Sequence, residues 1–344
     1  MHRLPILPLR VASLAILLGL AATTVQAETP VVVLQGKVVL QGKTGPAVGK
    51  HVVLIAADDE YRSEELIPQL AKILTVHHGC KCTVLFTVDP QTGLIDPGAQ
   101  NIPGLEALDS ADLLVLFARF RELPDKQMKH FVDYIDSGKP IIGLRTATHA
   151  FNYTRHKDSP YAKYSFNNTQ FSGGFGRQVL GETWIDHYGH HNVESTRATI
   201  APGMEQHPIV RGVGPIWGPS DVYAITRLTG DSKPLLLGHV LVGMKPTDPP
   251  NEKKQPVPVA WTKTYTGAQG KVSRVFTTTM GHCGDLKCEN FRRLLVNACY
   301  WCLGLEDKIP ARAEVDLVGA YDPNPIHGGG FKKNMKPSDY QLNI

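Results

Sequence analysis

Apolar runs alternate with segments of helical periodicity from residue 51 onward. Four short runs carry almost no polar alternation, which is typical of strands buried on both faces of a parallel sheet, and they lie at residues 51–57, 82–88, 111–118 and 140–144. Helical spacing of apolar residues appears between them, at residues 64–78 and 124–137. This alternation predicts an α/β fold with a doubly wound, mainly parallel sheet and helices on both faces.

The second half of the chain changes character before regular elements return. Residues 166–188 are rich in Gly, Asn, His and aromatic side chains without periodicity, which predicts a long loop. Strands are predicted at residues 235–242, 257–261 and 272–279, and a helix at residues 285–303 closes the domain. We therefore expect an N-terminal segment at residues 28–49, one α/β domain at residues 50–305 and an extended, proline- and glycine-rich C-terminal arm at residues 306–344.

The first 27 residues have the layout of a cleavable secretory signal. Basic Arg3 and Arg10 precede an apolar core at residues 11–22, and small residues end the segment at Ala27. Export to the periplasm or the extracellular space is predicted, with no membrane association after cleavage. Cleavage lowers the formal net charge from +4 to about +2, since the two arginines are the only charged side chains removed. That balance gives no electrostatic footprint for nucleic acid.

Six cysteines occur as three close pairs, Cys80 with Cys82, Cys283 with Cys288, and Cys299 with Cys302. An exported protein of this length permits disulfides without needing them, and the spacing assigns no connectivity. A zinc ribbon is the alternative, but the two CxxC knuckles that it needs are absent. Cys299 and Cys302 lie within a helical apolar pattern, which favours core cysteines.

The run KPIIGLRTATHAF, residues 139–151, reads as a buried strand that turns sharply into a helix. Elbows of this kind often present a nucleophile. Arg145 occupies that position here, and a guanidinium cannot be deprotonated in a protein. We expect Arg145 to act as a fixed cation towards a ligand, with His149 one turn later beside it.

Further polar groups follow other predicted strands, where open α/β sheets bind their ligands. Glu60 and Tyr61 belong to the run DDEYR after the first strand, a run that also fits a solvated helix start. Gly281-His282 follows the last strand, with Asp285 three residues later. A histidine on such a turn suits a general acid or base, and the alternative is a cap on the following helix.

Three histidines and one acid lie close together in WIDHYGHH, residues 184–191. Imidazole is the commonest protein metal ligand, so His187 and His191 are candidate ligands for a divalent metal, zinc. Adjacent His190 and His191 point to opposite faces of an extended chain, so only one of them is expected to join His187.

Several motifs together resemble those of a known family. They are GLRTATHAF at residues 143–151, GHH at 189–191, HPIVRGV at 207–213, SDVY at 220–223, RVFTTTMGH at 274–282 and FRRLLVNACYWCLGL at 291–305. With these motifs, residues 50–305 resemble the ThuA-like (trehalose-utilisation) family. The resemblance implies a flavodoxin-like fold of the class I glutamine amidotransferase type, without the thiol of those enzymes.

The resemblance also bears on chemistry. Arg145 lies where amidotransferases carry their cysteine, and His282 lies where they carry the triad histidine. Asp285 stands one residue later than the glutamate of such a triad would, so the resemblance implies no glutaminase activity. The family is linked to catabolism of trehalose and related sugars, although export departs from its cytoplasmic members.

Two functions remain open at this point. The first is an exported carbohydrate-processing protein of the hydrolase or isomerase type, acting on a trehalose-like disaccharide or an oxidised sugar. Its expected catalytic residues are His282, Arg145 and Asp285. Its expected substrate contacts come from polar and aromatic side chains, namely Glu60, Tyr61, His149, Trp184 and Tyr188. The second is a non-catalytic ligand-binding module on the same fold.

Overall fold

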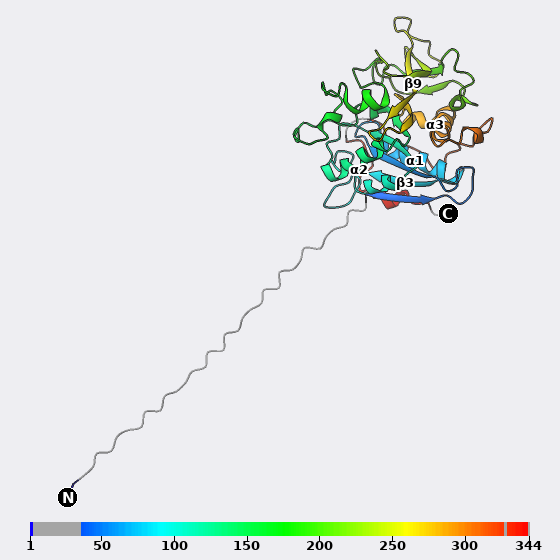
Figure 1. Ribbon diagram of the computed structural model, residues 1–344. Coiled ribbons are helices and arrows are strands. Elements are labelled where there is room, and N and C mark those ends of the chain that lie inside the picture. The colour runs from blue at the N-terminus through cyan, green and yellow to red at the C-terminus, as the bar shows by residue number, and fades with distance from the viewer. Residues whose placement is uncertain (3–35, 327–328, 343–344) are drawn as a thin grey trace. The chain divides into compact units, whose positions relative to one another are not determined.

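The computed structural model describes residues 1–2, 36–326 and 329–342, and within this part ten strands form one sheet (Figure 1). The strand order is β1-β3-β2-β4-β5-β10-β9-β8-β6-β7. The strands are β1 Lys37–Gln41, β2 His51–Ala57, β3 Lys81–Phe86, β4 Leu113–Ala118, β5 Ile141–Leu144, β6 Thr196–Ile200, β7 Ile216–Gly218, β8 Lys233–Val240, β9 Val257–Thr266 and β10 Val272–Thr278. The predicted signal peptide lies outside the described residues, apart from Met1 and His2.

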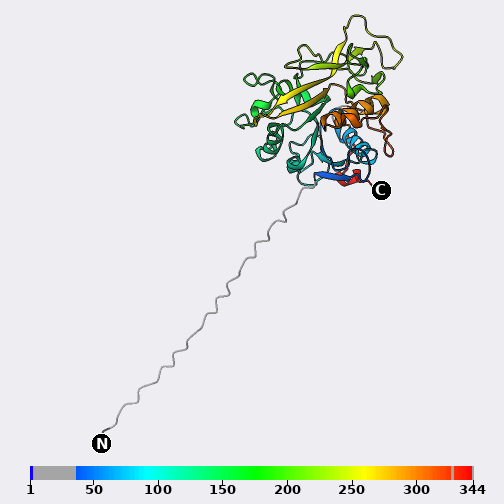
Figure 2. The ribbon, with the colours of Figure 1, turned by 45° about the vertical axis from the view of Figure 1, so that its right-hand side comes forward.

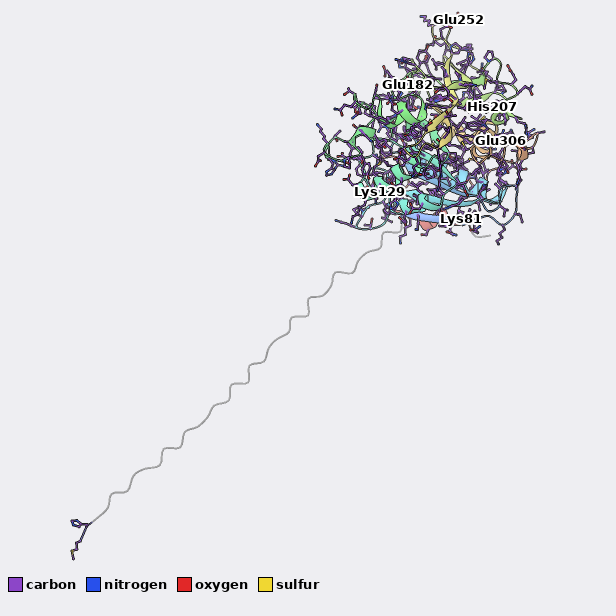
Figure 3. All side chains as sticks on the ribbon, viewed as in Figure 1. Lys81, Lys129, Glu182, His207, Glu252 and Glu306 are labelled. Atoms are coloured by element: carbon purple, nitrogen blue, oxygen red, sulfur yellow. The ribbon has the colours of Figure 1, made fainter. Side chains whose placement is uncertain are left out.

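The sheet is parallel in one half only. Strands β3, β2, β4, β5 and β10 pair in parallel, whereas β1 and the run β9-β8-β6-β7 pair antiparallel. Figure 3 shows Glu252, which lies between β8 and β9, and Lys81, at the start of β3, at opposite ends of the folded part of the chain. The fold is thus mixed α/β, and the prediction of a mainly parallel sheet holds only for the half that contains the apolar runs.

Helices cover both faces of the parallel half (Figure 2). Successive side chains of a strand point to opposite faces, so Val52 and Leu54 of β2 split from Val53 and Ile55. The first pair packs in one core cluster with α1 (Ser63–Val76) and α3 (Glu289–Cys302). The second pair packs in another with α2 (Asp125–Asp136). Continuous apolar strands are explained by this two-sided burial.

The segment after β5 differs from the predicted helix. It is a single 3₁₀ turn, Arg145–His149, that ends where the backbone pairs with the segment following β4. The N–H of Phe120 donates to the carbonyl of His149, and the N–H of Arg121 donates to the carbonyl of Ala150. The carbonyls of His149 and Ala150 thus accept hydrogen bonds from a neighbouring segment, and the chain does not continue as a helix after His149.

The closing helix also begins later than predicted. A 3₁₀ turn at Cys283–Lys287 precedes α3, so Asp285 belongs to the turn and not to the helix. Within residues 166–188 the structure places one regular element, a π-helical turn at Gly176–Leu180. Among the described residues, no helix is long and apolar enough to cross a membrane.

Beyond α3, the described residues of the C-terminal segment form only short 3₁₀ turns, at Glu306–Lys308 and Pro337–Tyr340. Val315 and Ile326 are buried in the cluster that contains α1 and α3. All six cysteines are free, and Cys299 and Cys302 lie buried in that core.

Candidate functional site

Unusual backbone conformations gather at the carboxyl ends of four neighbouring parallel strands. Arg62, Phe120 and Arg145, which follow β2, β4 and β5, have φ values of 63°, 50° and 46°. Gly281 follows β10 with φ 135°, and a Cβ placed there would lie 3.3 Å from Cβ of Arg145. A left-handed conformation costs a non-glycine residue about 1–3 kcal/mol and concentrates at functional sites. This edge of the sheet is therefore the first place to look for function.

Arg145 is buried and its guanidinium is enclosed by protein oxygen atoms. Nη1 donates to the backbone carbonyls of Asp221 (2.6 Å) and Thr279 (2.9 Å). Nη2 donates to Oγ of Ser220 (3.0 Å) and to Oδ1 of Asp221 (2.9 Å). Both terminal nitrogens of Arg145 thus donate to protein oxygen atoms, whereas its buried Nε has no hydrogen-bond partner among the described residues. The expected role of Arg145 towards a ligand stays a prediction.

Two aromatic rings sandwich the same guanidinium. Its Cζ lies 4.2 Å from the ring centroid of Tyr61 and 4.6 Å from that of Tyr223. Both tyrosines are buried, so the cation–π attraction acts in a desolvated environment. Arg145 thus joins the turn after β2 to the segment 220–223 and fixes both.

Asp221 is a fully buried carboxylate that several donors share. Besides Arg145 and the Ser220 hydroxyl, Nδ1 of His187 lies 2.6 Å from its Oδ2, and Nδ1 of His191 lies 3.0 Å from its Oδ1. Burial alone would raise the pKa of Asp221, but the Arg145 guanidinium and the two imidazoles outweigh it and hold that pKa well below its usual range. Asp221 is therefore ionised and orients both rings.

The two imidazoles lie side by side, with ring centroids 4.6 Å apart, and they remain partly exposed. The hydroxyl of Tyr61 is 3.2 Å from Nε2 of His191, and Oε1 of Glu60 is 3.9 Å from the same nitrogen. Glu60 in turn pairs with Arg119 at 3.1 Å. The structure thus brings the predicted Glu60, Tyr61, His187 and His191 together.

His282 reaches the same group through Tyr61, since the two ring centroids are 6.4 Å apart. Its Nδ1 accepts the N–H of Gly284 at 2.7 Å, so it caps the turn that precedes α3. Oδ2 of Asp285 accepts the N–H groups of Gly281 (2.8 Å) and His282 (3.1 Å). Burial raises the pKa of Asp285 to about 6. Asp285 is fully buried and positions the Gly281-His282 turn through Oδ2, and its expected role in catalysis stays a prediction.

A family model described as trehalose utilisation, ThuA, matches residues 99–302. The chain belongs to the ThuA family. The residues brought together at this sheet edge form a histidine cluster, made up of Glu60, Tyr61, Arg145, His187, His191, Asp221 and His282. All of them except Glu60 and Tyr61 lie within the matched region. No curated protein matches the chain.

Solved structures similar to this ThuA-family chain include two putative ThuA-like proteins. One, from Parabacteroides merdae, is 14% identical, with 86% of this chain and 99% of that chain covered and a TM-score of 0.45. The other, from Bacteroides uniformis, is 14% identical, with 79% and 98% covered and a TM-score of 0.46. A β-galactosidase from Rahnella sp. R3 is 11% identical, with 76% and 32% covered and a TM-score of 0.40.

His149 and Trp184 lie in an aromatic group beside the cluster. The ring of His149 is 4.9 Å from Phe120, 5.3 Å from Trp184 and 5.5 Å from Tyr223, measured between centroids. Burial lowers the pKa of His149 well below its ordinary value, so the ring is neutral. His149 is therefore a buried, neutral histidine within this aromatic group, and its expected contact with substrate stays a prediction.

Trp184 and Tyr188 have different surroundings. Trp184 is 5.9 Å from His187 by centroids and also lines a cavity of about 460 Å³ with Phe166 and Arg177. Tyr188 is half-buried against the α1 and α3 core, with Nζ of Lys254 5.9 Å from its ring centroid. No ring contact among the described residues joins Tyr188 to the histidines. Of these two side chains, Trp184 therefore borders the histidine cluster and Tyr188 does not.

Sequence reasoning missed Asp221 as a site residue, and it considered Asp58 only as part of the run DDEYR. Asp221 appears only inside the SDVY motif, and no spacing rule links it to a histidine 34 positions away. Asp58 is buried, and its Oδ2 accepts from Oγ1 of Thr146 at 3.0 Å, which ties the turn after β2 to the turn after β5. A carboxyl at a strand end was the available signal for Asp58.

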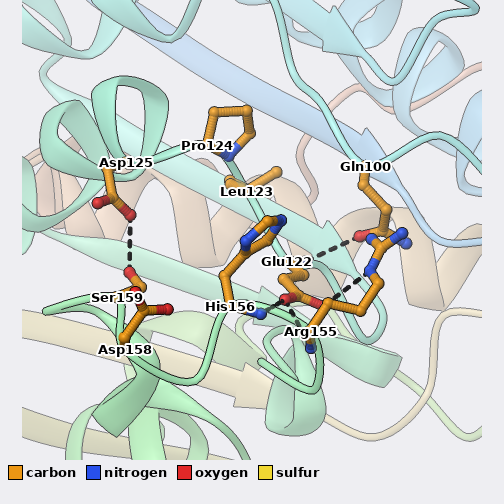
Figure 4. Close-up of a pocket in the computed structure, with 9 residues that line it drawn as sticks. All are labelled: Gln100, Glu122, Leu123, Pro124, Asp125, Arg155, His156, Asp158 and Ser159. Carbon is orange, nitrogen blue, oxygen red and sulfur yellow. Dashed lines mark hydrogen bonds and ion pairs between the residues drawn. The ribbon is translucent and has the colours of Figure 1, made fainter.

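A cavity of about 500 Å³ lies elsewhere, between the segment after β4 and the loop at residues 155–159 (Figure 4). The buried Glu122 carboxylate accepts the N–H groups of Arg155 (2.9 Å) and His156 (2.5 Å). Its negative charge is thus already balanced by protein donors. None of the residues of the histidine cluster lines this cavity.

Proposed function

We propose that this ThuA-family protein is exported and processes a carbohydrate, either a trehalose-like disaccharide or an oxidised sugar. We also propose the finer description of its fold, a flavodoxin-like domain of the class I glutamine amidotransferase type at residues 50–305. The family supports a role related to trehalose utilisation in broad terms. Export rests on the signal pattern at residues 1–27.

One observation carries the proposal of a sugar site: four partly exposed polar side chains form a series of contacts from Arg119 through Glu60 and His191 to His187. Glu60, Arg119, His187 and His191 have side chains that are 19%, 26%, 32% and 24% exposed. Carboxylate, guanidinium and imidazole groups together offer both acceptors and donors for sugar hydroxyls. Trp184, at the border of this group, supplies an apolar face of the kind that stacks on sugar rings.

His282 is the proposed proton donor. A backbone N–H can only donate, so Nδ1 of His282 must accept from Gly284 with its lone pair. In the neutral ring the proton therefore sits on Nε2. In this tautomer Nε2–H can donate a hydrogen bond to a sugar oxygen, and the neutral ring has no free lone pair to act as a base. Transfer of a proton to that oxygen requires the imidazolium form, in which Nδ1 also carries a proton and no longer accepts the Gly284 N–H.

A non-catalytic binding module is the second candidate, and one observation favours it. Arg145 and Asp285, two of the three residues expected to carry catalysis, are committed to contacts within the protein. Binding without turnover needs neither of them at the ligand. The two candidate functions differ in whether loss of the His282 imidazole removes turnover of a sugar.

The test is a screen of the purified mature protein against trehalose, related disaccharides and their keto derivatives, for binding and for turnover. His282→Asn is the decisive variant, because asparagine can still accept the Gly284 N–H as a cap. His190→Ala is the control, because it removes an exposed imidazole from the loop that carries His187 and His191. An enzyme should lose about 10²- to 10⁴-fold in rate in His282→Asn, with unchanged thermal stability.

Three other outcomes would revise this proposal. Turnover that persists in His282→Asn would make His282 only a cap. Binding without turnover in the unmodified protein would select the binding module. Neither binding nor turnover with any of these sugars would reject the carbohydrate assignment.

A further inference from the structure

We infer that His187, His191 and Asp221 form a binding site for one divalent transition-metal ion. One ligand atom from each of the three residues lies within 4.8 Å of the others. Nδ1 of His187 is 2.6 Å from Oδ2 of Asp221, and Nδ1 of His191 is 3.0 Å from Oδ1. Metal–ligand bonds of about 2.0–2.2 Å place neighbouring ligand atoms roughly 3.3 Å apart in a tetrahedral site. Each of the two Nδ1 atoms thus lies within that spacing of one oxygen of the Asp221 carboxylate.

The donor set selects the class of metal. Two imidazole nitrogens and one carboxylate suit Zn²⁺ or Fe²⁺, whereas Mg²⁺ and Ca²⁺ prefer sites built from oxygen atoms. We take Zn²⁺ as the probe, with Mg²⁺ as the ion that should not bind.

The surrounding residues hold the ligands in place, as metal sites require. Arg145 donates to Oδ1 of Asp221 at 2.9 Å, and the Ser220 hydroxyl donates to the same oxygen at 3.1 Å. The hydroxyl of Tyr61, 3.2 Å from Nε2 of His191, fixes the orientation of that ring when Nδ1 faces the metal. These contacts leave Oδ2 of Asp221 on the side of His187.

The backbone adds rigidity to the same arrangement. His187 forms an isolated β-bridge with Tyr223, and the N–H of Tyr188 donates to the carbonyl of Val222 at 2.8 Å. The loop that carries both histidines is therefore tied to the segment that carries Asp221. A site held in this way is preorganised, which reduces the ordering cost of binding an ion.

Exposure differs across the three residues in a way that suits an open coordination sphere. Asp221 is fully enclosed, while the imidazoles of His187 and His191 keep about a third and a quarter of their surface exposed. Three protein ligands with an open side are typical of catalytic metal sites, where water or substrate takes the remaining position. This assignment does not depend on the identity of the sugar.

The test measures metal content without any sugar. The mature protein is stripped with a chelator, incubated with Zn²⁺ or Mg²⁺, dialysed and analysed by elemental mass spectrometry, and zinc affinity is measured by calorimetry. We expect about one zinc and no magnesium per chain. His187→Gln and His191→Gln should each lower zinc affinity by more than about 100-fold. Tyr61→Phe, which removes a hydroxyl that contacts a ligand and not the metal, should lower it by only about 10- to 100-fold.

His190→Ala is the matched control, since it removes an exposed imidazole from the same loop. It should keep full zinc content. The proposal is overturned if the unmodified protein retains less than about a tenth of an equivalent of zinc, or if His190→Ala loses zinc as completely as His187→Gln. Circular dichroism of each variant separates loss of a ligand from loss of folding, and His187→Gln is the primary variant because His187 is partly exposed. Failure here leaves the carbohydrate proposal standing, since its own test reads binding and turnover of sugars.

Discussion

Replacement of Arg145 should be one of the most destabilising single changes in this protein. The guanidinium is fully buried, donates four hydrogen bonds and lies between two aromatic rings. Arg145→Ala leaves the buried Asp221 without its cation. Breaking a buried ion pair by removing one partner costs about 3–5 kcal/mol. We expect about 3 kcal/mol, the lower end, because the imidazoles of His187 and His191 still contact the carboxylate.

A second variant separates the side chain from the backbone. Arg145 has φ 46°, a left-handed conformation that costs an L-residue with a Cβ about 1–2 kcal/mol. Arg145→Gly loses the same contacts as Arg145→Ala but relieves this strain. It should therefore be about 1 kcal/mol more stable than the alanine variant.

The assay is urea unfolding of both variants, with Arg312→Ala as the control. The Arg312 side chain is 71% exposed and pairs with Glu289 at the surface, where an ion pair contributes about 0–1 kcal/mol. The reasoning fails if Arg145→Ala and Arg312→Ala reduce the free energy of unfolding equally. Equal stability of the glycine and alanine variants would refute the strain argument alone.

Three further predictions follow from the buried carboxyl, the missing nucleophile and the signal pattern. Burial raises the pKa of Asp285 to about 6 from an ordinary value of 3.8, so the folded state binds this proton more tightly than the unfolded state does. The stability that this group contributes is therefore lost as pH rises from about 4 to about 6. Asp285→Asn should flatten the fall in unfolding free energy across that window by up to about 3 kcal/mol, and an unchanged pH profile in urea unfolding would contradict it. Glutamine should yield no ammonia, because Arg145 occupies the position of the nucleophile. The thiol of Cys283 lies 3.8 Å from Nδ1 of His282, but burial raises its pKa to about 12, so it is not a thiolate. Ammonia release that depends on a cysteine would show this prediction to be wrong. Exported protein should begin at Glu28, and terminal sequencing that finds Met1 on it would exclude cleavage after Ala27.

The sequence by itself predicted the parallel half of the sheet closely. The apolar runs at residues 51–57 and 111–118 correspond to β2 (His51–Ala57) and β4 (Leu113–Ala118), and the periodic run at 64–78 corresponds to α1 (Ser63–Val76). Hydrophobic periodicity is a local property, so it can be recognised without knowing what the element packs against. The same reasoning placed Arg145 and His282 at one edge, because the carboxyl ends of parallel strands meet there.

Only the tertiary structure decided what those residues do. Arg145 is enclosed by Ser220 and Asp221, 75 and 76 positions away, and nothing in its local sequence indicates a buried partner. His187 and His191 converge on Asp221 because the antiparallel half of the sheet brings the segment 220–223 to the histidine loop. A hydrogen bond depends on the placement of two side chains to within a few tenths of an ångström. Such placement arises from packing across the whole fold, which no local pattern of residue types encodes.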